Sequence, residues 1–153
     1  MRVHEFDSAQ WLPLPREQIF DFFSDAANLD AITPRWLRFR TLTPAPVVMR
    51  AGTLIDYDLR IRGIPIRWRT RIDFWEPPFR FVDEQVSGPY RLWVHEHTFV
   101  AANGGTLMRD RVRYAVPLDF LVHRMLVRPE IERIFAYRTE QMHRRFAAPA
   151  RVT

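Results

Sequence analysis

Two histidines, an aspartate and a tyrosine between residues 90 and 116 are the groups of this sequence best suited to chemistry. His95 and His97 are separated by one residue, so on a β-strand their side chains point to the same face. An aspartate that holds one nitrogen of an imidazole fixes its tautomer and raises its basicity, which suits a general base or a group that orients a ligand. Such chemistry requires that the chain bring Asp110 against the histidines.

The sequence Asn103-Gly104-Gly105 supplies a turn that would do this, because it tolerates positive φ and can close a hairpin. With Ala102 and Gly105 flanking a two-residue turn, one face of the hairpin carries the pairs Trp93–Tyr114, His95–Val112, His97–Asp110 and Phe99–Met108. The other face carries charged residues, among them Glu96 opposite Arg111, and is expected to face water. The face with the histidines is expected to lie inside.

Burying these polar groups without partners would cost about 1–3 kcal/mol each, so the inner face needs an explanation. Three interpretations of His97 and Asp110 remain open: a satisfied pair that fixes the register of the hairpin, a pair that orients a ligand, or a general acid–base pair. A hydrolytic triad is not expected, because no serine or cysteine nucleophile is evident beside them.

Two histidines and a carboxylate on one face could also bind a metal ion. However, no glutamate or further histidine arrives from this hairpin to complete the set formed by His95, His97 and Asp110. We therefore expect neither a metal nor another cofactor.

The composition indicates one folded domain. A chain of 153 residues can bury about 68–70% of its unfolded surface, and it is 47% hydrophobic and 14% aromatic. It has no cysteine, which excludes disulfides and thiolate zinc sites. No apolar run approaches the ~20 residues of a membrane span, and the N-terminal residues lack the apolar core of a signal peptide. A cytoplasmic protein is expected.

The net charge of +5, carried by basic residues that are all arginine, raises nucleic acid as a partner. A second hairpin, over residues 53–74, argues against it. A turn at Gly63-Ile64 would place Asp58 opposite Arg69 and Asp56 opposite Arg71. The aspartates would then offset the positive charge of a surface that could otherwise bind phosphates. We predict no nucleic-acid partner.

The remaining patterns predict the order of elements. They indicate a strand over residues 1–10, a helix that opens at residues 14–17, a short helix over 29–32, and short strands over 37–42 and 79–86. The alternation does not decide which face of strand 79–86 is inner. Residues 117–146 are predicted to be helical, with a kink or restart at Pro129, and residues 148–153 to form a flexible tail.

This order predicts an α+β fold in which a curved antiparallel sheet wraps around a long C-terminal helix. The chain resembles the START-like, helix-grip superfamily (SRPBCC), which includes polyketide cyclase/dehydrase proteins and coenzyme-Q-binding lipid chaperones. The resemblance covers nearly the whole chain and is carried by PREQIFDFFSD at 15–25, FVDEQVSGPYRLWVHEHTF at 81–99, GGTLMRDRVRYAVP at 104–117 and ERIFAYR at 132–138.

The resemblance implies an apolar cavity between the sheet and the C-terminal helix, within one domain over residues 1–147. The residues that it suggests for the cavity wall are Tyr57, Leu59, Trp68, Thr70, Trp93, His95, His97, Phe99, Met108, Asp110, Val112, Tyr114, Phe135 and Arg138. Apolar walls with a few polar groups are typical of small-molecule sites.

We therefore expect the protein to bind a hydrophobic or aromatic small molecule, such as a lipid, an isoprenoid or a polyketide-like compound, as a carrier or a sensor. The alternative is a polyketide cyclase/dehydrase-type enzyme that uses His97 with Asp110 as general acid–base. A transient contact with a membrane surface is left open, and nothing in the sequence indicates the oligomeric state.

Overall fold

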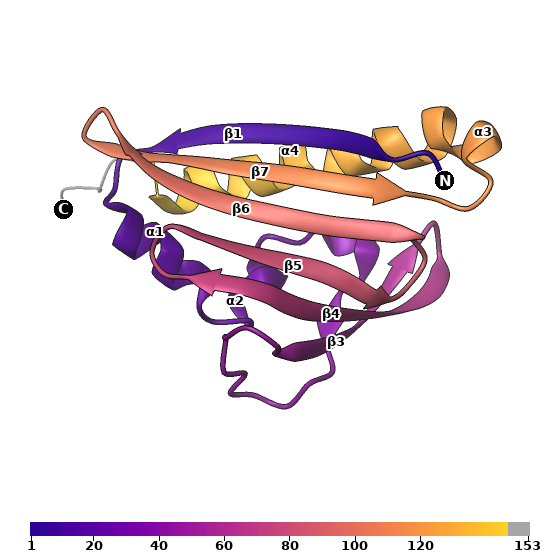
Figure 1. Cartoon of the computed structure of the whole chain (residues 1–153), viewed down its shortest axis with the longest axis horizontal. Coiled ribbons are helices and arrows are strands. Elements are labelled where there is room, and N and C mark those ends of the chain that lie inside the picture. Colours follow the sequence, from indigo (N-terminus) through magenta and orange to yellow (C-terminus); the bar gives the residue numbers. More distant parts are fainter. Residues whose placement is uncertain (147–153) are drawn as a thin grey trace.

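The computed structural model describes residues 1–146, which form one antiparallel sheet of seven strands together with several helices (Figure 1). The elements follow in the order β1 (His4–Leu12), α1 (Arg16–Phe23), α2 (Asn28–Ala31), the 3-10 helix η1 (Arg35–Leu37), β2 (Arg40–Thr41), β3 (Leu54–Ile61), β4 (Ile64–Glu76), β5 (Arg80–Ser87), β6 (Leu92–Ala102), β7 (Gly105–Ala115), α3 (Asp119–Val122), the π-helix η2 (His123–Val127) and α4 (Arg128–Phe146). The tail expected at residues 148–153 lies outside the described residues.

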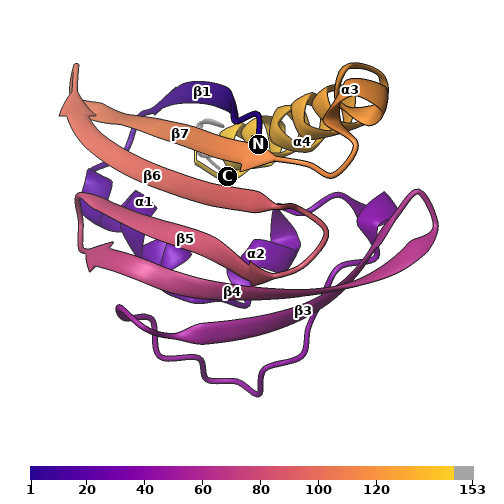
Figure 2. The same cartoon turned by 45° about the vertical axis from the view of Figure 1, so that its right-hand side comes forward.

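The strands are arranged in the order β1-β7-β6-β5-β4-β3-β2, so the first strand pairs with the last and β2 forms the opposite edge. The sheet curves, with the long helix α4 running along its β1–β7 side and the short helices α1 and α2 on the same face (Figure 2). This is the predicted helix-grip arrangement.

The core has two main parts on that face of the sheet. Helix α1 packs through Ile19 and Phe20 against Phe99 and Met108 of the central hairpin. Helix α4 packs against Val112 and Tyr114 of β7 through Ile131 and Phe135. The two helices therefore cover the β6–β7 side of the sheet from its two ends.

The β6–β7 hairpin has the predicted register. His97 pairs with Asp110, and the neighbouring pairs Trp93–Tyr114, His95–Val112 and Phe99–Met108 also form. The turn residues Asn103 and Gly104 have φ of 50° and 76°, as a two-residue turn of this hand requires.

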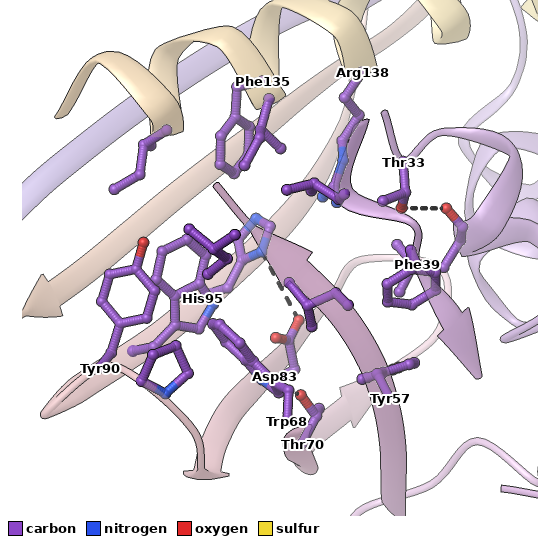
Figure 3. Close-up of a pocket in the computed structure, with 18 of the residues that line it drawn as sticks. Thr33, Phe39, Tyr57, Trp68, Thr70, Asp83, Tyr90, His95, Phe135 and Arg138 are labelled. Atoms are coloured by element: carbon purple, nitrogen blue, oxygen red, sulfur yellow. Dashed lines mark hydrogen bonds and ion pairs between the residues drawn. The ribbon is translucent and has the colours of Figure 1, made fainter. Parts of the chain in front are cut away.

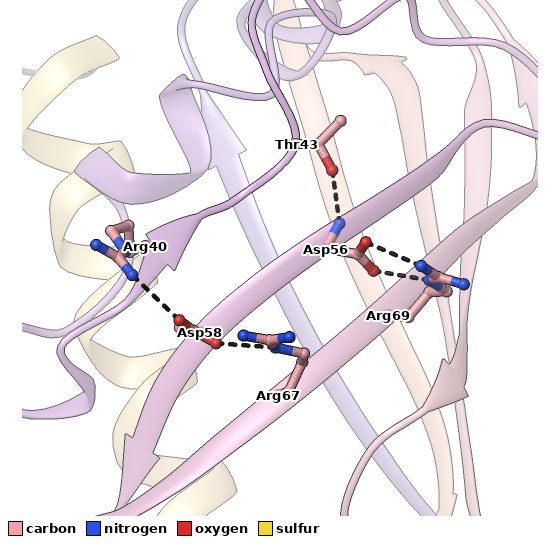
Figure 4. A network of polar contacts seen from close by, with 6 residues as sticks. All are labelled: Arg40, Thr43, Asp56, Asp58, Arg67 and Arg69. Atoms are coloured by element: carbon pink, nitrogen blue, oxygen red, sulfur yellow. Dashed lines mark hydrogen bonds and ion pairs between the residues drawn. The ribbon is translucent and has the colours of Figure 1, made fainter.

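The predicted register of the β3–β4 hairpin is wrong by two residues. The two turn residues are Arg62 and Gly63, both with positive φ, rather than Gly63 and Ile64. Arg69 consequently lies opposite Asp56, and its Nε and Nη2 donate hydrogen bonds of 2.8 and 3.0 Å to the two carboxylate oxygens (Figure 4). Asp58 accepts from Arg40 and Arg67 instead. A shift of two residues preserves the faces, so the charged side still lies outward.

Strand β5, whose inner face the sequence left undecided, turns Phe81 and Asp83 inward. Phe81 lies opposite His97 and Asp83 opposite His95. Phe81 is buried and stacks on the ring of His97 with a centroid separation of 3.9 Å. The pairing of β5 places a second carboxylate beside the two histidines.

Two local predictions were refined by the structure. The segment predicted as a strand over 37–42 is partly the helix η1, and only Arg40–Thr41 pair with β3. The helical region after residue 117 is interrupted before Pro129: α3 runs into the π-helix η2, and α4 restarts at Arg128. Pro129 is well placed near the start of α4, because proline has no N–H group and the N–H groups of the first helical turn have no acceptor within the helix.

Candidate ligand cavity

A mostly apolar cavity of about 440 Å³ lies between the curved sheet and the helices (Figure 3). Strands β3 to β6 supply one wall, α4 and η2 a second, and the segment from α1 to Met49 a third. Such a volume and composition are typical of a pocket for a small organic molecule.

Nine of the predicted wall residues line this cavity. They are Tyr57, Leu59, Trp68, Thr70, Trp93, His95, His97, Phe135 and Arg138.

The other five predicted residues, Phe99, Met108, Asp110, Val112 and Tyr114, are buried and are not among the residues that line the cavity. Helix α1 fills the space above Phe99 and Met108, while α4 fills the space above Val112 and Tyr114. Asp110 lies behind the histidines.

The two histidines stack on each other and are held between two aspartates. Their ring centroids are 3.7 Å apart. Nε2 of His95 lies 2.7 Å from Oδ1 of Asp110, and Nε2 of His97 lies 2.7 Å from Oδ2 of Asp83. Nδ1 of His97 is a further 3.3 Å from Oδ1 of Asp110. We call these four side chains the His–Asp cluster.

The pKa values of the two histidines in the His–Asp cluster are shifted in opposite directions. Burial lowers the pKa of His95, and the adjacent His97 lowers it further, which outweighs the hydrogen bond to Asp110. Burial also acts to lower the pKa of His97, but its hydrogen bonds to Asp110 and Asp83 outweigh burial and raise it. His97 is therefore the histidine that holds the proton more tightly.

The aspartates respond in the complementary way. Burial by itself would raise the pKa of both carboxyls, but the hydrogen bonds and charges of the histidines outweigh it and hold the pKa of Asp83 and Asp110 below the usual range. The cluster thus combines two carboxylates with one imidazole whose pKa is raised and one whose pKa is lowered.

Arg138 extends from α4 into the same space (Figure 3). Its Nε is buried and has no hydrogen-bond partner within residues 1–146. Its guanidinium carbon lies 5.2 Å from the ring centroid of Phe135. The structure therefore places Arg138 at the cavity.

Within residues 1–146, two groups of side chains bring atoms of the kinds that bind metal ions close to one another. Asp83, His95 and His97 form one group, and His4, Asp119 and His123 form the other, with ligand atoms within 4.8 Å in each. In the first group, the Nε2 atoms already bond to carboxylates. In the second, the rings of His4 and His123 stack with an interplanar angle of 7°, so a metal ion could not lie in both ring planes without rotation of a ring.

Sequence reasoning missed Asp83 as a site residue. Its position two residues after Phe81 was a usable signal, because a buried Phe81 puts Asp83 on the same inner face. It also missed the lining residues Arg62, Pro89 and Leu126, which come from three separate parts of the chain. Only the folded chain brings those three together.

The sequence profile of the family described as "Polyketide cyclase / dehydrase and lipid transport" matches residues 12–142. The chain belongs to this family. The match spans the sheet from the end of β1 to β7 and most of α4, so it includes the whole wall of the cavity. A search of the curated proteins finds no match to this sequence.

Solved structures similar to this family member share the fold along nearly their whole length. A major latex-like protein from Panax ginseng has a TM-score of 0.70 at 10% identity, covering 95% of this chain and 99% of its own. A protein from Chromobacterium violaceum has a TM-score of 0.71 at 12% identity, with the same two coverages of 95% and 99%. A protein from Thermus thermophilus has a TM-score of 0.61 at 15% identity, covering 92% of both chains.

At these identities the likeness shows the fold alone. Together with the family match it places the protein in the START-like, helix-grip superfamily, which is associated with the binding of hydrophobic ligands. Within residues 1–146, none of the helices combines the length and the apolarity that crossing a bilayer requires.

Proposed function

We propose that the protein binds a hydrophobic or aromatic small molecule in the cavity between sheet and α4, as a carrier or a sensor. The observation that carries this proposal is the cavity itself: about 440 Å³ of space, walled mainly by apolar and aromatic side chains, with Asp83, His97 and Arg138 among its few polar groups. Burial of apolar ligand surface contributes roughly 25 cal/mol per Å², and the polar groups would orient the ligand.

The proposal is tested by native mass spectrometry of the freshly purified protein, followed by denaturing extraction. We expect a non-covalent adduct of the mass of a small organic molecule, and its identity gives the ligand class. Leu59→Trp should fill the cavity and remove the adduct. Leu54→Trp is the matched control, because Leu54 lies on the same strand but is 47% exposed, whereas Leu59 is 9% exposed.

Retention of the adduct by Leu59→Trp would place the ligand elsewhere. Failure of the native protein to carry an adduct or to bind any apolar compound added to it would remove the carrier proposal. Both variants are compared with the native protein by thermal unfolding, so that loss of the adduct is not mistaken for loss of the fold.

An enzyme of the cyclase or dehydrase type is the second candidate. The observation in its favour is that His97, the more basic histidine, lines the cavity with a carboxylate 2.7 Å from its Nε2. A histidine placed in this way is a candidate general base or acid, although Asp83 rather than Asp110 is its closest partner. The ligand identified by mass spectrometry would then be a substrate or a product.

The two candidates are separated by His97→Asn. If this variant loses turnover of the identified compound while its affinity stays within about tenfold, the enzyme is supported. If affinity alone changes and neither protein alters the compound, the carrier or sensor is supported.

We also propose that the mouth of the cavity touches a membrane surface transiently when the ligand is exchanged. Exposed apolar residues gather in α3 and η2, with Phe120 at 84% and Met125 at 76% exposure, and Leu126 both is exposed and lines the cavity. Arg124 lies among them and is exposed. Apolar groups flanked by a cation suit the interface of an anionic bilayer.

Flotation with vesicles that contain an anionic lipid tests this contact. Phe120→Asp should reduce vesicle binding, whereas Val48→Asp, which changes an exposed apolar residue outside this region, should leave it unchanged. Equal binding by all three proteins would show that this surface does not contact the membrane.

A further inference from the structure

Arg138 is a cation in a mostly apolar cavity, and its Nε has no hydrogen-bond partner in the structure of residues 1–146. This Nε is buried, although the charges of Asp110 and Asp83 act on the guanidinium. Its nearest aromatic neighbour is Phe135 of the same helix. A buried donor that is left without a hydrogen bond is costly, so this arrangement calls for a group that supplies the missing interaction.

The carboxylates near Arg138 already have partners. Asp83 bonds to His97 and Asp110 bonds to His95, each at 2.7 Å. Nδ1 of His97 also lies 3.3 Å from Asp110, so both nitrogens of this histidine face a carboxylate. The His–Asp cluster thus satisfies itself and leaves the donors of Arg138 for a molecule in the cavity.

His97 can carry a positive charge in the cavity, but Asp83 and Asp110 already bond to it, and the tyrosines and Arg62 do not supply a free inner cation. Burial raises the pKa of Tyr57 and of Tyr90, so both hydroxyls remain neutral and can add only a hydrogen bond. Arg62 also lines the cavity, but it is exposed to solvent. Among the lining residues that the structure describes, Arg138 is the inner cation to which neither Asp83 nor Asp110 bonds, whereas both bond to His97.

We propose that Arg138 recognises an acidic oxygen group on the ligand, such as a carboxylate or an acidic enol, and that the ligand is therefore an apolar or aromatic acid. This rests on the proposed binding of a small molecule in the cavity. A planar guanidinium matches the geometry of a carboxylate through two parallel hydrogen bonds, which a lysine or a neutral donor does not offer. The rest of the ligand would lie along the aromatic wall that Trp68, Tyr90 and Trp93 form.

A matched pair of fluorescent probes tests the charge requirement. 8-Anilinonaphthalene-1-sulfonate and N-phenyl-1-naphthylamine share one aromatic skeleton, and only the first carries an anionic group. We expect the native protein to bind the sulfonate at least about tenfold more tightly than the neutral amine, as a charge-assisted hydrogen bond in a cavity predicts. Competition between the two probes establishes that they occupy the same site.

Arg138→Gln should remove this preference while it preserves the affinity for the neutral amine, which also shows that the cavity remains intact. Arg138→Lys should retain part of the preference. Arg144→Gln is the control, because Arg144 lies on the same helix and is 67% exposed, so it matches the change in net charge without touching the cavity.

The outcomes separate the two proposals. If the neutral amine binds and the sulfonate binds no more tightly, the acidic ligand is wrong but the apolar cavity stands. If the preference survives in Arg138→Gln, or falls equally in Arg144→Gln, the sulfonate is recognised elsewhere and the role of Arg138 is wrong. If neither probe binds, the proposed small-molecule site itself fails.

Discussion

Nε2 of His97 lies 2.7 Å from Oδ2 of Asp83, although the strand partner of His97 on β7 is Asp110. The same diagonal arrangement occurs on the other side, where His95 bonds to Asp110 while its partner on β5 is Asp83. Each imidazole thus joins β6 to a different neighbouring strand. The His–Asp cluster links three central strands of the sheet, and it does so at the wall of the cavity.

The first prediction concerns the buried carboxylate of this cluster. Asp110→Asn should lower the free energy of unfolding by about 3–5 kcal/mol at neutral pH, because it removes the carboxylate bonded to His95 and one of the two beside His97 from a buried charged cluster. Urea denaturation measures the change. Asp56→Asn, at an exposed ion pair with Arg69, should leave the midpoint almost unchanged. Equal midpoints for the two variants would show that the cluster does not stabilise the fold.

The second prediction concerns the protonation of the two histidines. Titration followed by NMR should give His97 a pKa above the ordinary value of about 6.5 and His95 a pKa below it. Asp83→Asn should lower the pKa of His97, since it removes a hydrogen-bonded carboxylate, whereas His95 keeps its bond to Asp110.

This prediction has a consequence for stability. Because folding raises the pKa of His97, its contribution is fully present below about pH 6.5 and is lost as the pH rises through the folded-state value. That loss should be smaller in Asp83→Asn. A pKa for His97 below that of His95 would reverse the assignment of the more basic group.

The third prediction concerns Gly105 at the start of β7. A Cβ there would press against the carbonyl oxygen of Leu12 and lie 2.7 Å from Cζ2 of Trp11. Gly105→Ala should therefore cost more than about 3 kcal/mol, since a backbone atom cannot rotate away as a side chain can in ordinary overpacking. Thermal or urea unfolding measures this.

Gly63→Ala is the comparison for Gly105. Gly63 has a φ of 78° with open space around it, so the added methyl group causes only backbone strain of about 1–2 kcal/mol. A smaller loss for Gly105→Ala than for Gly63→Ala would mean that β1 and β7 are not packed as closely as described.

The fourth prediction concerns the ligand-free protein. Arg138→Met should raise its free energy of unfolding by about 1 kcal/mol or more, because the change replaces a buried cation whose Nε lacks a hydrogen-bond partner by an apolar side chain of similar length. Burial lowers the pKa of Arg138, although Asp110 and Asp83 act against this, which is consistent with a cost to the charge. Arg144→Met, on the exposed side of α4, should give no such gain. A loss of stability in Arg138→Met would indicate that the guanidinium is compensated in the free protein.

The fold class and the central hairpin could be predicted from the sequence pattern alone. Alternation of side chains along β6 and β7, with a turn at Asn103 and Gly104, was enough to predict every pair of the inner face. This is possible because a shift by one residue would turn the apolar face outward, and Asn-Gly is the strongest signal for a two-residue turn, so the two together select this register. The register of β3–β4 was not determined in this way, since turns at Gly63-Ile64 and at Arg62-Gly63 keep the same faces inward.

The sequence pattern could not predict which of the proposed wall residues line the cavity, because this depends on how the helices pack on the sheet. The helices α1 and α4 press on β6 and β7 and fill the space above Phe99, Met108, Val112 and Tyr114, whereas β3 to β5 curve away and leave the cavity open. Likewise, Asp83 reaches His97 only because β5 pairs with β6. Local alternation fixes the face of a side chain, but what lies above that face depends on contacts between elements distant in the sequence.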